Sequence, residues 1–125
     1  MSLEGWLLVA LSGCLTVIAN LSLRAGVDKA GGFPGKLADI VPGLVHLGAQ
    51  PLFDIGVILY AVASLVWFRI VATQPLSSAY PVLVSITFIF VTLGAVVLFR
   101  EPISMVKLGG IVVILVGIII ISRMG

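Results

Sequence analysis

The chain of 125 residues is 61% hydrophobic and only 10% charged, and its mean hydropathy is +1.32. This composition excludes an ordinary water-soluble domain. The net charge of +2 comes from seven basic and five acidic side chains, too few for the basic surface that nucleic-acid binding requires. A bilayer core about 30 Å thick needs roughly 20 apolar residues per helix. We therefore expect an all-α membrane protein, with residues 1–125 forming one bundle of four transmembrane helices.

The single cysteine, Cys14, cannot form an internal disulfide, and its surroundings offer no metal-ligand spacing. Residues 11–14, Leu-Ser-Gly-Cys, look like the box at which bacterial lipoproteins are cleaved and acylated. The flanks argue against acylation, because the start carries Glu4 and no Lys or Arg, and the sequence stays apolar to Leu23. We expect a membrane-embedded cysteine, and neither a metal nor a cofactor.

The first predicted span covers residues 5–23 and stops where a charge, Arg24, is followed by a glycine typical of helix ends, Gly26. Residues 25–51 contain six Gly, three Pro and four charged side chains, which predicts a loop outside the hydrocarbon. Apolar side chains recur between positions 37 and 47 of this loop. They predict one or two short helical turns resting in the interfacial layer.

Three further spans follow the loop. The second covers residues 54–71, with Asp54 as a cap, and the third covers residues 77–99 after a tight turn. The sequence Arg-Glu-Pro at 100–102 ends the third span and places a proline at the start of the fourth, residues 103–121.

Four spans place both termini on one side of the membrane and the loops after spans one and three on the other. Five basic residues fall on the loop side and two on the terminal side: Arg24, Lys29, Lys36, Arg100 and Lys107 against Arg69 and Arg123. The positive-inside rule therefore predicts that these loops face the inside and the termini the outside.

A polar stripe runs along the first span. Its residues recur every four positions, so they share one broad helix face: Ser12, Thr16, Asn20 and Arg24. Two interpretations stay open. The stripe can serve helix packing, with Arg24 reaching the headgroups, or it can line a substrate pathway.

The second and third spans carry comparable faces. Their residues recur every four positions in one span and every seven in the other: Gly56, Tyr60 and Ser64, then Ser78, Ser85 and Thr92. Such residues favour close helix packing, and a wet cavity uses the same types. Gly110 and Gly117 form a seam in the fourth span, which predicts self-association or pairing with a sister subunit.

Isolated polar residues elsewhere have simpler interpretations. Arg69, Asp54 and Glu101 are near span ends, where they can anchor or cap a helix. Tyr80 precedes a proline one turn into the third span, and we expect this kink to border a transported molecule. His46 stands alone in the loop segment, without partners for a catalytic relay, so we expect no enzyme.

The third and fourth spans resemble the drug/metabolite transporter superfamily. The resemblance rests on Pro-Leu-Ser-Ser-Ala-Tyr-Pro at 75–81, Phe-Val-Thr-Leu-Gly-Ala-Val at 90–96 and Phe-Arg-Glu-Pro-Ile-Ser at 99–104. Within that superfamily, the chain is most similar to the small paired subunits that flip undecaprenyl-phosphate-linked aminoarabinose. This resemblance implies four helices per subunit, often assembled as dimers with opposite orientations around a site in mid-membrane.

The chain departs from the small multidrug exporters of the same superfamily. Those proteins carry an essential glutamate in their first helix, and aligning their first-helix lysine with Arg24 puts Thr16 at the glutamate position. A neutral Thr16 cannot exchange protons for cations. An anionic cargo fits better, because Arg24 and also Arg69 could bind a phosphate by charge-assisted hydrogen bonds.

We therefore expect a flippase subunit of the bacterial inner membrane that translocates a polyprenyl-phosphate-linked sugar or a similar lipid, as a homodimer or with a sister subunit. A cation exporter and a non-transporting accessory subunit are the alternatives. The residues expected to line the pathway are Thr16, Asn20, Arg24, Tyr60, Ser64, Arg69, Tyr80 and Ser85.

Overall fold

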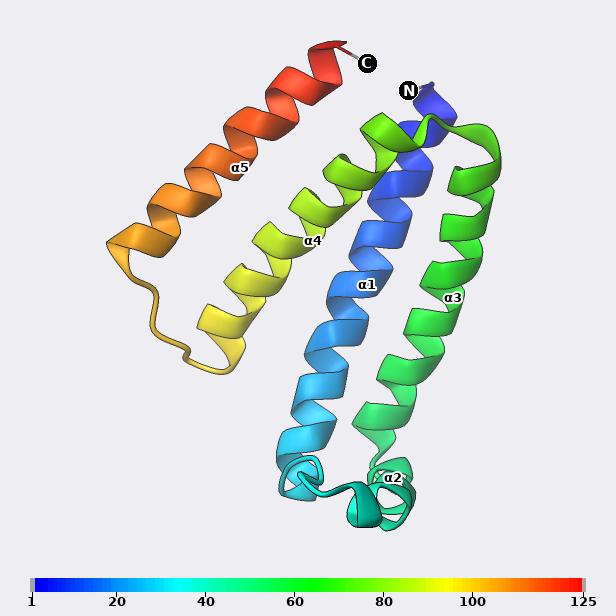
Figure 1. The fold of residues 1–125 in the computed structure, drawn as a ribbon, viewed down its shortest axis with the longest axis vertical. Coiled ribbons are helices and arrows are strands. Elements are labelled where there is room, and N and C mark those ends of the chain that lie inside the picture. Colours follow the sequence, from blue (N-terminus) through cyan, green and yellow to red (C-terminus); the bar gives the residue numbers. More distant parts are fainter. Residues whose placement is uncertain (1, 125) are drawn as a thin grey trace.

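The computed structural model describes residues 2–124, and within that range it contains helices and no strand. The elements in chain order are α1 (Leu3–Ala30), the 3-10 turn η1 (Leu37–Asp39), α2 (Ile40–Gly48), α3 (Pro51–Thr73), α4 (Leu76–Leu98) and α5 (Met105–Met124). Both chain ends lie at one end of the bundle, and α2 lies at the other (Figure 1). The all-α prediction is confirmed.

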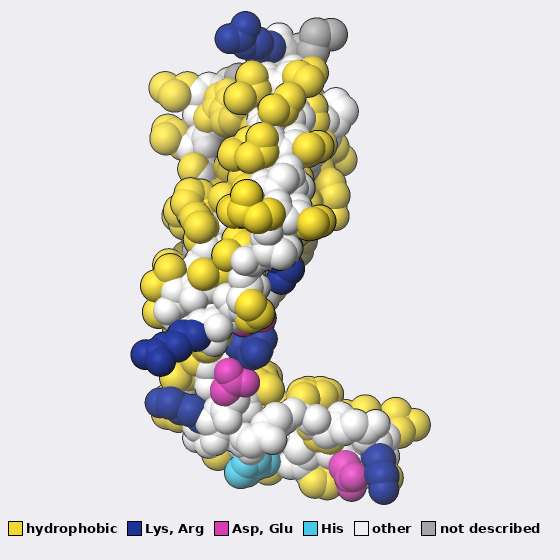
Figure 2. Space-filling model, turned by 90° about the vertical axis from the view of Figure 1, so that its left-hand side faces the viewer, with side chains coloured by type: hydrophobic (Ala, Val, Ile, Leu, Met, Phe, Trp, Pro, Cys, Tyr) yellow, Lys and Arg dark blue, Asp and Glu magenta, His cyan; other side chains and the backbone are white. Residues whose placement is uncertain are grey.

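Three helices, α1, α3 and α4, are long and apolar enough to cross a membrane. The chain is therefore a multi-pass membrane protein. The fourth predicted span coincides with α5, whose apolar stretch Met105–Ile121 is shorter. Lys and Arg side chains gather towards the end of the bundle that carries α2, with another group at the opposite end (Figure 2).

α1 is the central helix of the bundle. It packs against α3 over much of its length and against α4 on another side, whereas α5 packs only on α4 within the part of the chain that the structure describes. Figure 1 shows α4 between α1 and α5. Four fully buried side chains near the terminal end form the core shared by α1, α3 and α4: Val9, Ile70, Ala79 and Val82.

The end of α1 differs from the prediction. The helix continues past Leu23 to Ala30, and Gly26 lies buried inside it. A Cβ built on Gly26 would lie 2.5 Å from the backbone nitrogen of Phe53. Gly26 thus permits the close approach of α1 and α3 instead of ending the helix. The left-handed conformation that ends α1 belongs to Gly31, at φ +91°.

Glycine also shapes the same interface further along. Gly56 of α3 is buried against α1, and a Cβ there would lie 2.7 Å from Leu23 Cγ and 3.0 Å from the carbonyl oxygen of Ala19. Close contact of this kind is a main source of helix association in lipid, where burying apolar surface gives no advantage over contact with lipid chains. The face predicted from Gly56, Tyr60 and Ser64 therefore contains a packing residue.

The segment between α1 and α3 contains two short helical elements, η1 and α2, as the sequence predicted. Leu47 of α2 is buried against the rest of the chain. The imidazole Nε2 of His46 lies 3.1 Å from the carbonyl oxygen of Ala30. These contacts fix α2 across the adjoining ends of α1 and α3.

The glycine contact between α1 and α3 yields a stability prediction. Gly26→Ala places a methyl group against the Phe53 backbone, and we expect the free energy of unfolding to fall by about 1–3 kcal/mol. Gly109→Ala is the control, since a Cβ at Gly109 meets nothing within 4 Å. It should leave stability unchanged or raise it by up to about 1 kcal/mol through helix propensity. Thermal unfolding in detergent, followed by circular dichroism, distinguishes the variants, and equal melting temperatures would contradict the assignment.

Candidate functional site

A cavity of about 620 Å³ lies between α1, α3 and α4. Its polar lining comes from Thr16 and Asn20 of α1, Tyr60 of α3, and Tyr80, Thr87 and Thr92 of α4. An adjoining cavity of about 170 Å³ is also lined by Thr16, Tyr60 and Tyr80, and adds Ser12 and Ser64. The structure thus brings together five of the residues predicted to line a pathway: Thr16, Asn20, Tyr60, Ser64 and Tyr80.

One hydrogen bond crosses between helices at the larger cavity. The Tyr60 hydroxyl donates to Asn20 Oδ1 at 3.0 Å. Asn20 in turn donates through Nδ2 to the carbonyl oxygen of Thr16, also at 3.0 Å. The amide of Asn20 is therefore held in one orientation by a neighbouring helix and by its own.

The polar stripe of α1 divides between two environments. Ser12 is buried and its hydroxyl donates to the carbonyl oxygen of Ala63 at 3.4 Å, a packing contact with α3. The hydroxyl of Thr16 donates to the carbonyl oxygen of Ser12 at 2.8 Å, while the residue itself lines the cavity. Ser12 therefore serves helix packing, as the first interpretation expected, while Thr16 and Asn20 lie in the wall of a polar cavity.

Thr87 was not among the residues predicted from the sequence. Its hydroxyl is buried and has no hydrogen-bond partner in the described structure, and the residue lines the larger cavity. The available signal was its spacing of seven residues from Tyr80, which places the two on one face of α4. Ser85, which was predicted, lines neither of these cavities. Two positions along a helix correspond to about 200° of rotation, so Ser85 and Thr87 lie on nearly opposite sides of α4.

Arg24 lies at the loop end of α1, where its charge is already matched. Its Nε is 3.2 Å from Asp28 Oδ1 and its Nη1 is 4.0 Å from Glu101 Oε1. The guanidinium also lies over the ring of Phe99, 5.4 Å from its centroid. The contact with Glu101 links α1 to the connection between α4 and α5. About half of each of these charged side chains is exposed.

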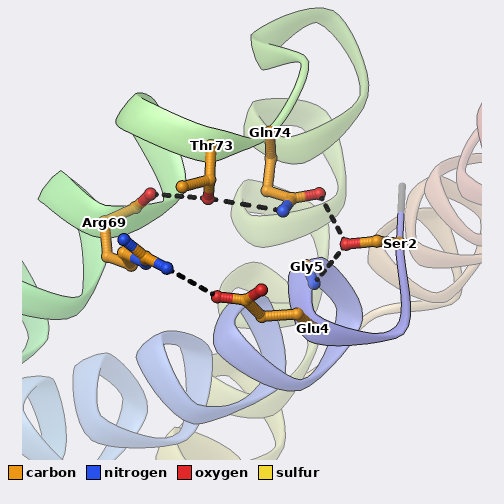
Figure 3. A network of polar contacts seen from close by, with 6 residues as sticks. All are labelled: Ser2, Glu4, Gly5, Arg69, Thr73 and Gln74. Atoms are coloured by element: carbon orange, nitrogen blue, oxygen red, sulfur yellow. Dashed lines mark hydrogen bonds and ion pairs between the residues drawn. The ribbon is translucent and has the colours of Figure 1, made fainter.

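Arg69 lies at the opposite end of the bundle. Its Nη2 is 3.2 Å from Glu4 Oε1, and Figure 3 shows this ion pair beside a hydrogen-bonded cluster of Ser2, Thr73 and Gln74. At 1.5 Å per residue, positions 4 and 24 of α1 are about 30 Å apart. A single phosphate therefore cannot contact Arg24 and Arg69 at once, and the polar cavity lies between them.

Lys107, which entered the prediction only through the positive-inside rule, lies near the cavity. Lys107 of α5 lines two grooves, of about 220 and 290 Å³, between α4 and the start of α5. Thr92 lines both grooves and the larger cavity. Lys107 makes no ion pair within 4.0 Å among residues 2–124, although Glu101 lines one of the two grooves with it.

The two glycines of the predicted seam have open space around them. A Cβ on Gly110 or Gly117 would meet nothing within 4 Å in the described chain. Gly110 lines the larger of the two grooves beside α5. The seam therefore makes no close helix contact inside this chain, in contrast to Gly26 and Gly56.

The hydrogen bond between Tyr60 and Asn20 can be tested by removing one hydroxyl. We expect Tyr60→Phe to lower the free energy of unfolding by about 0.6 kcal/mol, an average value for hydrogen bonds between membrane helices. Tyr80→Phe is the matched control: the Tyr80 hydroxyl has no hydrogen bond in the described structure, and the ring contact with Trp67 at 5.8 Å is retained. Unfolding by sodium dodecyl sulfate, followed by circular dichroism, measures both. The same midpoint for both variants would show that the bond adds no stability.

Comparisons with known proteins identify the family of the chain. No model of a protein family and no solved structure matches the chain. A protein from Shewanella sediminis, named "probable 4-amino-4-deoxy-L-arabinose-phosphoundecaprenol flippase subunit ArnF", is 34% identical over 130 residues, which cover 97% of this chain and 89% of its own. The protein from Erwinia tasmaniensis with the same description as subunit ArnE is 34% identical over 116 residues, covering 93% and 94%.

A further ArnF subunit, from Proteus mirabilis, is 31% identical over 130 residues and covers 95% of this chain and 92% of its own. The matches extend over the first half of the chain as well as the second, where the sequence motifs are concentrated. They confirm the resemblance stated from the sequence. The chain belongs to the family of ArnE and ArnF flippase subunits.

Proposed function

We propose that this protein translocates a polyprenyl-phosphate-linked sugar across the bacterial inner membrane, as one subunit of a pair. The substrate class named for its relatives, 4-amino-4-deoxy-L-arabinose-phosphoundecaprenol, is the cargo that we infer for it. Moving such a lipid between leaflets breaks no covalent bond, so the proposal assigns transport and no enzymatic reaction.

The polar cavity between α1, α3 and α4 carries this proposal. Its polar groups are hydroxyls and one amide, and none of its lining residues is acidic or basic. Neutral donors and acceptors of this kind suit the hydroxyl groups of a sugar. The same cavity is lined by Leu83, Val84 and Phe88, so it combines apolar walls with polar contacts.

The side of the cavity formed by α4 suits a lipid with a long tail. Among its lining residues, Tyr80 is 58% and Phe88 47% exposed. α3 and α4 contact each other far less than either contacts α1. A sugar headgroup held at Asn20 and Tyr60 could therefore leave its polyprenyl chain in the surrounding lipid. A second subunit could cover the part of this opening that the tail does not use.

The cation-exporter alternative lacks an acidic group in the site. Asp54 lies in the first turn of α3, and Glu101 lies in the connection between α4 and α5. Neither lines the larger cavity. A proton-coupled exporter needs a carboxylate inside the membrane, which Thr16 does not supply. The arrangement favours an anionic lipid whose phosphate stays near the loop end, where the cations Arg24 and Lys107 lie.

Reconstituted vesicles test the function directly. The protein, alone and with a sister subunit, is placed in vesicles whose membrane contains the radiolabelled polyprenyl-phosphate sugar. Transfer of this lipid between leaflets is followed by the accessibility of its sugar to a membrane-impermeant reagent. We expect Arg24→Ala to reduce transfer about tenfold or more, because a charge-assisted phosphate contact contributes on the order of 1.5–3 kcal/mol. Arg24→Lys should retain part of the activity.

Lys29→Ala is the control for this experiment, since it removes the same charge from the same end of α1. Lys29 makes neither of the ion pairs described for Arg24, which include the contact with Glu101 before α5. Normal transfer by Arg24→Ala would show that Arg24 only anchors the helix. Absence of transfer by the unaltered pair would favour an accessory role, and proton-coupled export of cationic dyes would favour the exporter.

We further propose that α5 is the fourth span and forms the contact between subunits. The open space at Gly110 and Gly117 supports this assignment, since small residues let a second helix approach closely. One relative named ArnF and one named ArnE are each 34% identical to this chain over most of its length. The partner is therefore inferred to be a sister subunit or a second copy.

The contact is tested by enlarging one glycine. Gly117→Leu should reduce the yield of cross-linked dimer in membranes severalfold, because the leucine side chain would separate the two backbones. Gly109→Leu provides the control: Gly109 is one residue from Gly110, about 100° around α5, and is also exposed. An unchanged yield in Gly117→Leu, or an equal loss in both variants, would place the contact elsewhere.

A further inference from the structure

The segment between α1 and α3 forms an arm that projects from the bundle. We call residues 32–48, which include η1 and α2, the α2 arm. Figure 2 shows it extending sideways from the foot of the molecule, so that the outline resembles an L. Most of the hydrophobic side chains visible on the arm lie along its upper side, which faces the level of the membrane-length helices (Figure 2).

The arm carries an apolar face that no other helix covers among residues 2–124. Leu37, Val41 and Val45 are 86%, 71% and 72% exposed. Their four-residue spacing places them on one side of the helical segment. Phe33 and Leu44 add further exposed apolar surface to the arm. Exposure of this apolar face to water would be unfavourable. The face therefore indicates surroundings other than water.

The arm is attached to the bundle along a different side. Leu47 is 1% exposed, and His46 Nε2 lies beside the carbonyl oxygen of Ala30. Within the arm, Pro34 lies directly against Gly43, at a distance that leaves no room for a Cβ. These contacts give the arm a defined position relative to α1 and α3, and they leave Leu37, Val41 and Val45 exposed.

The position of the arm relative to the membrane-length helices indicates that lipid covers its apolar face. It lies across adjoining ends of α1 and α3, two helices of membrane length, and so at the level where hydrocarbon gives way to headgroups. A soluble partner would approach from the water side, where Figure 2 shows an acidic and a basic side chain at the lower outer corner of the arm. The sequence supplies Lys36 and Asp39 in this part of the chain.

We propose that the α2 arm lies in the headgroup layer of the bilayer, with the face formed by Leu37, Val41 and Val45 buried in lipid. A short helix with one apolar side and polar groups on the other adopts this orientation at a membrane surface. The arm then fixes the depth and tilt of the ends of α1 and α3, next to Arg24. This role depends on the membrane location of the chain and not on the identity of its cargo.

Site-directed spin labelling tests the placement. In a Cys14→Ser background, a nitroxide is attached to Val41→Cys or, as the matched control, to Lys36→Cys. Both positions are exposed, so neither label disturbs a buried contact. The full chain is reconstituted in vesicles of phosphatidylethanolamine and phosphatidylglycerol. Relaxation of each label by oxygen, which concentrates in lipid, is compared with relaxation by a water-soluble nickel chelate.

We expect the ratio of oxygen to nickel accessibility to be at least severalfold higher at position 41 than at position 36. Equal and high nickel accessibility at both positions would place the arm in water. Protection of position 41 from both reagents would mean that protein covers the face. Either result would overturn the proposal, while the translocation assay of the unaltered protein would be unaffected by it.

Discussion

The structure depends on one constraint, which is that hydrocarbon offers no hydrogen-bond partner to a polar group. α1 carries Ser12, Thr16 and Asn20 along one side, and these side chains must be satisfied by protein or by a bound molecule. This requirement explains why α1, the first helix in the chain, is also the central one, with α3 and α4 on different sides. Small residues at Gly26 and Gly56 then let α3 approach closely enough for Tyr60 to reach Asn20.

The hydrogen bonds made by the polar side chains of α1 leave some of their donors and acceptors free to pair with a bound molecule. The hydroxyls of Thr16 and Ser64 donate to carbonyl oxygens of their own helices, so they hold no second helix in place. Their remaining lone pairs, with the second N–H and the second lone pair of the Asn20 amide, can still pair with a bound molecule. The Thr87 hydroxyl is buried without a partner in the described structure. This combination suits the cargo that we propose, because its headgroup must be bound firmly enough to leave water and weakly enough to be released.

Sequence alone identified what depends on short-range geometry. The four-residue spacing of Thr16 and Asn20 is a property of one helix, and so is the apolar length of each span. The role of Gly26 was assigned wrongly because a helix-ending glycine and a packing glycine have the same local pattern. Only the approach of Phe53, far along the chain, separates them. The pairing of Arg24 with Glu101 is likewise set by tertiary structure, which no spacing could predict.

That pairing also bears on the phosphate contact that we propose for Arg24. Asp28 is one turn away on the same helix and lies 3.2 Å from Arg24, whereas Glu101 belongs to the connection before α5 and lies 4.0 Å away. An incoming phosphate would compete first with the longer contact, which is also the one that ties α1 to the α4–α5 connection. That connection includes Arg100, whose φ of +54° is unfavourable for a residue with a side chain. Anion binding at Arg24 would thereby be coupled to the position of α5, the helix that we propose forms the contact with the partner subunit.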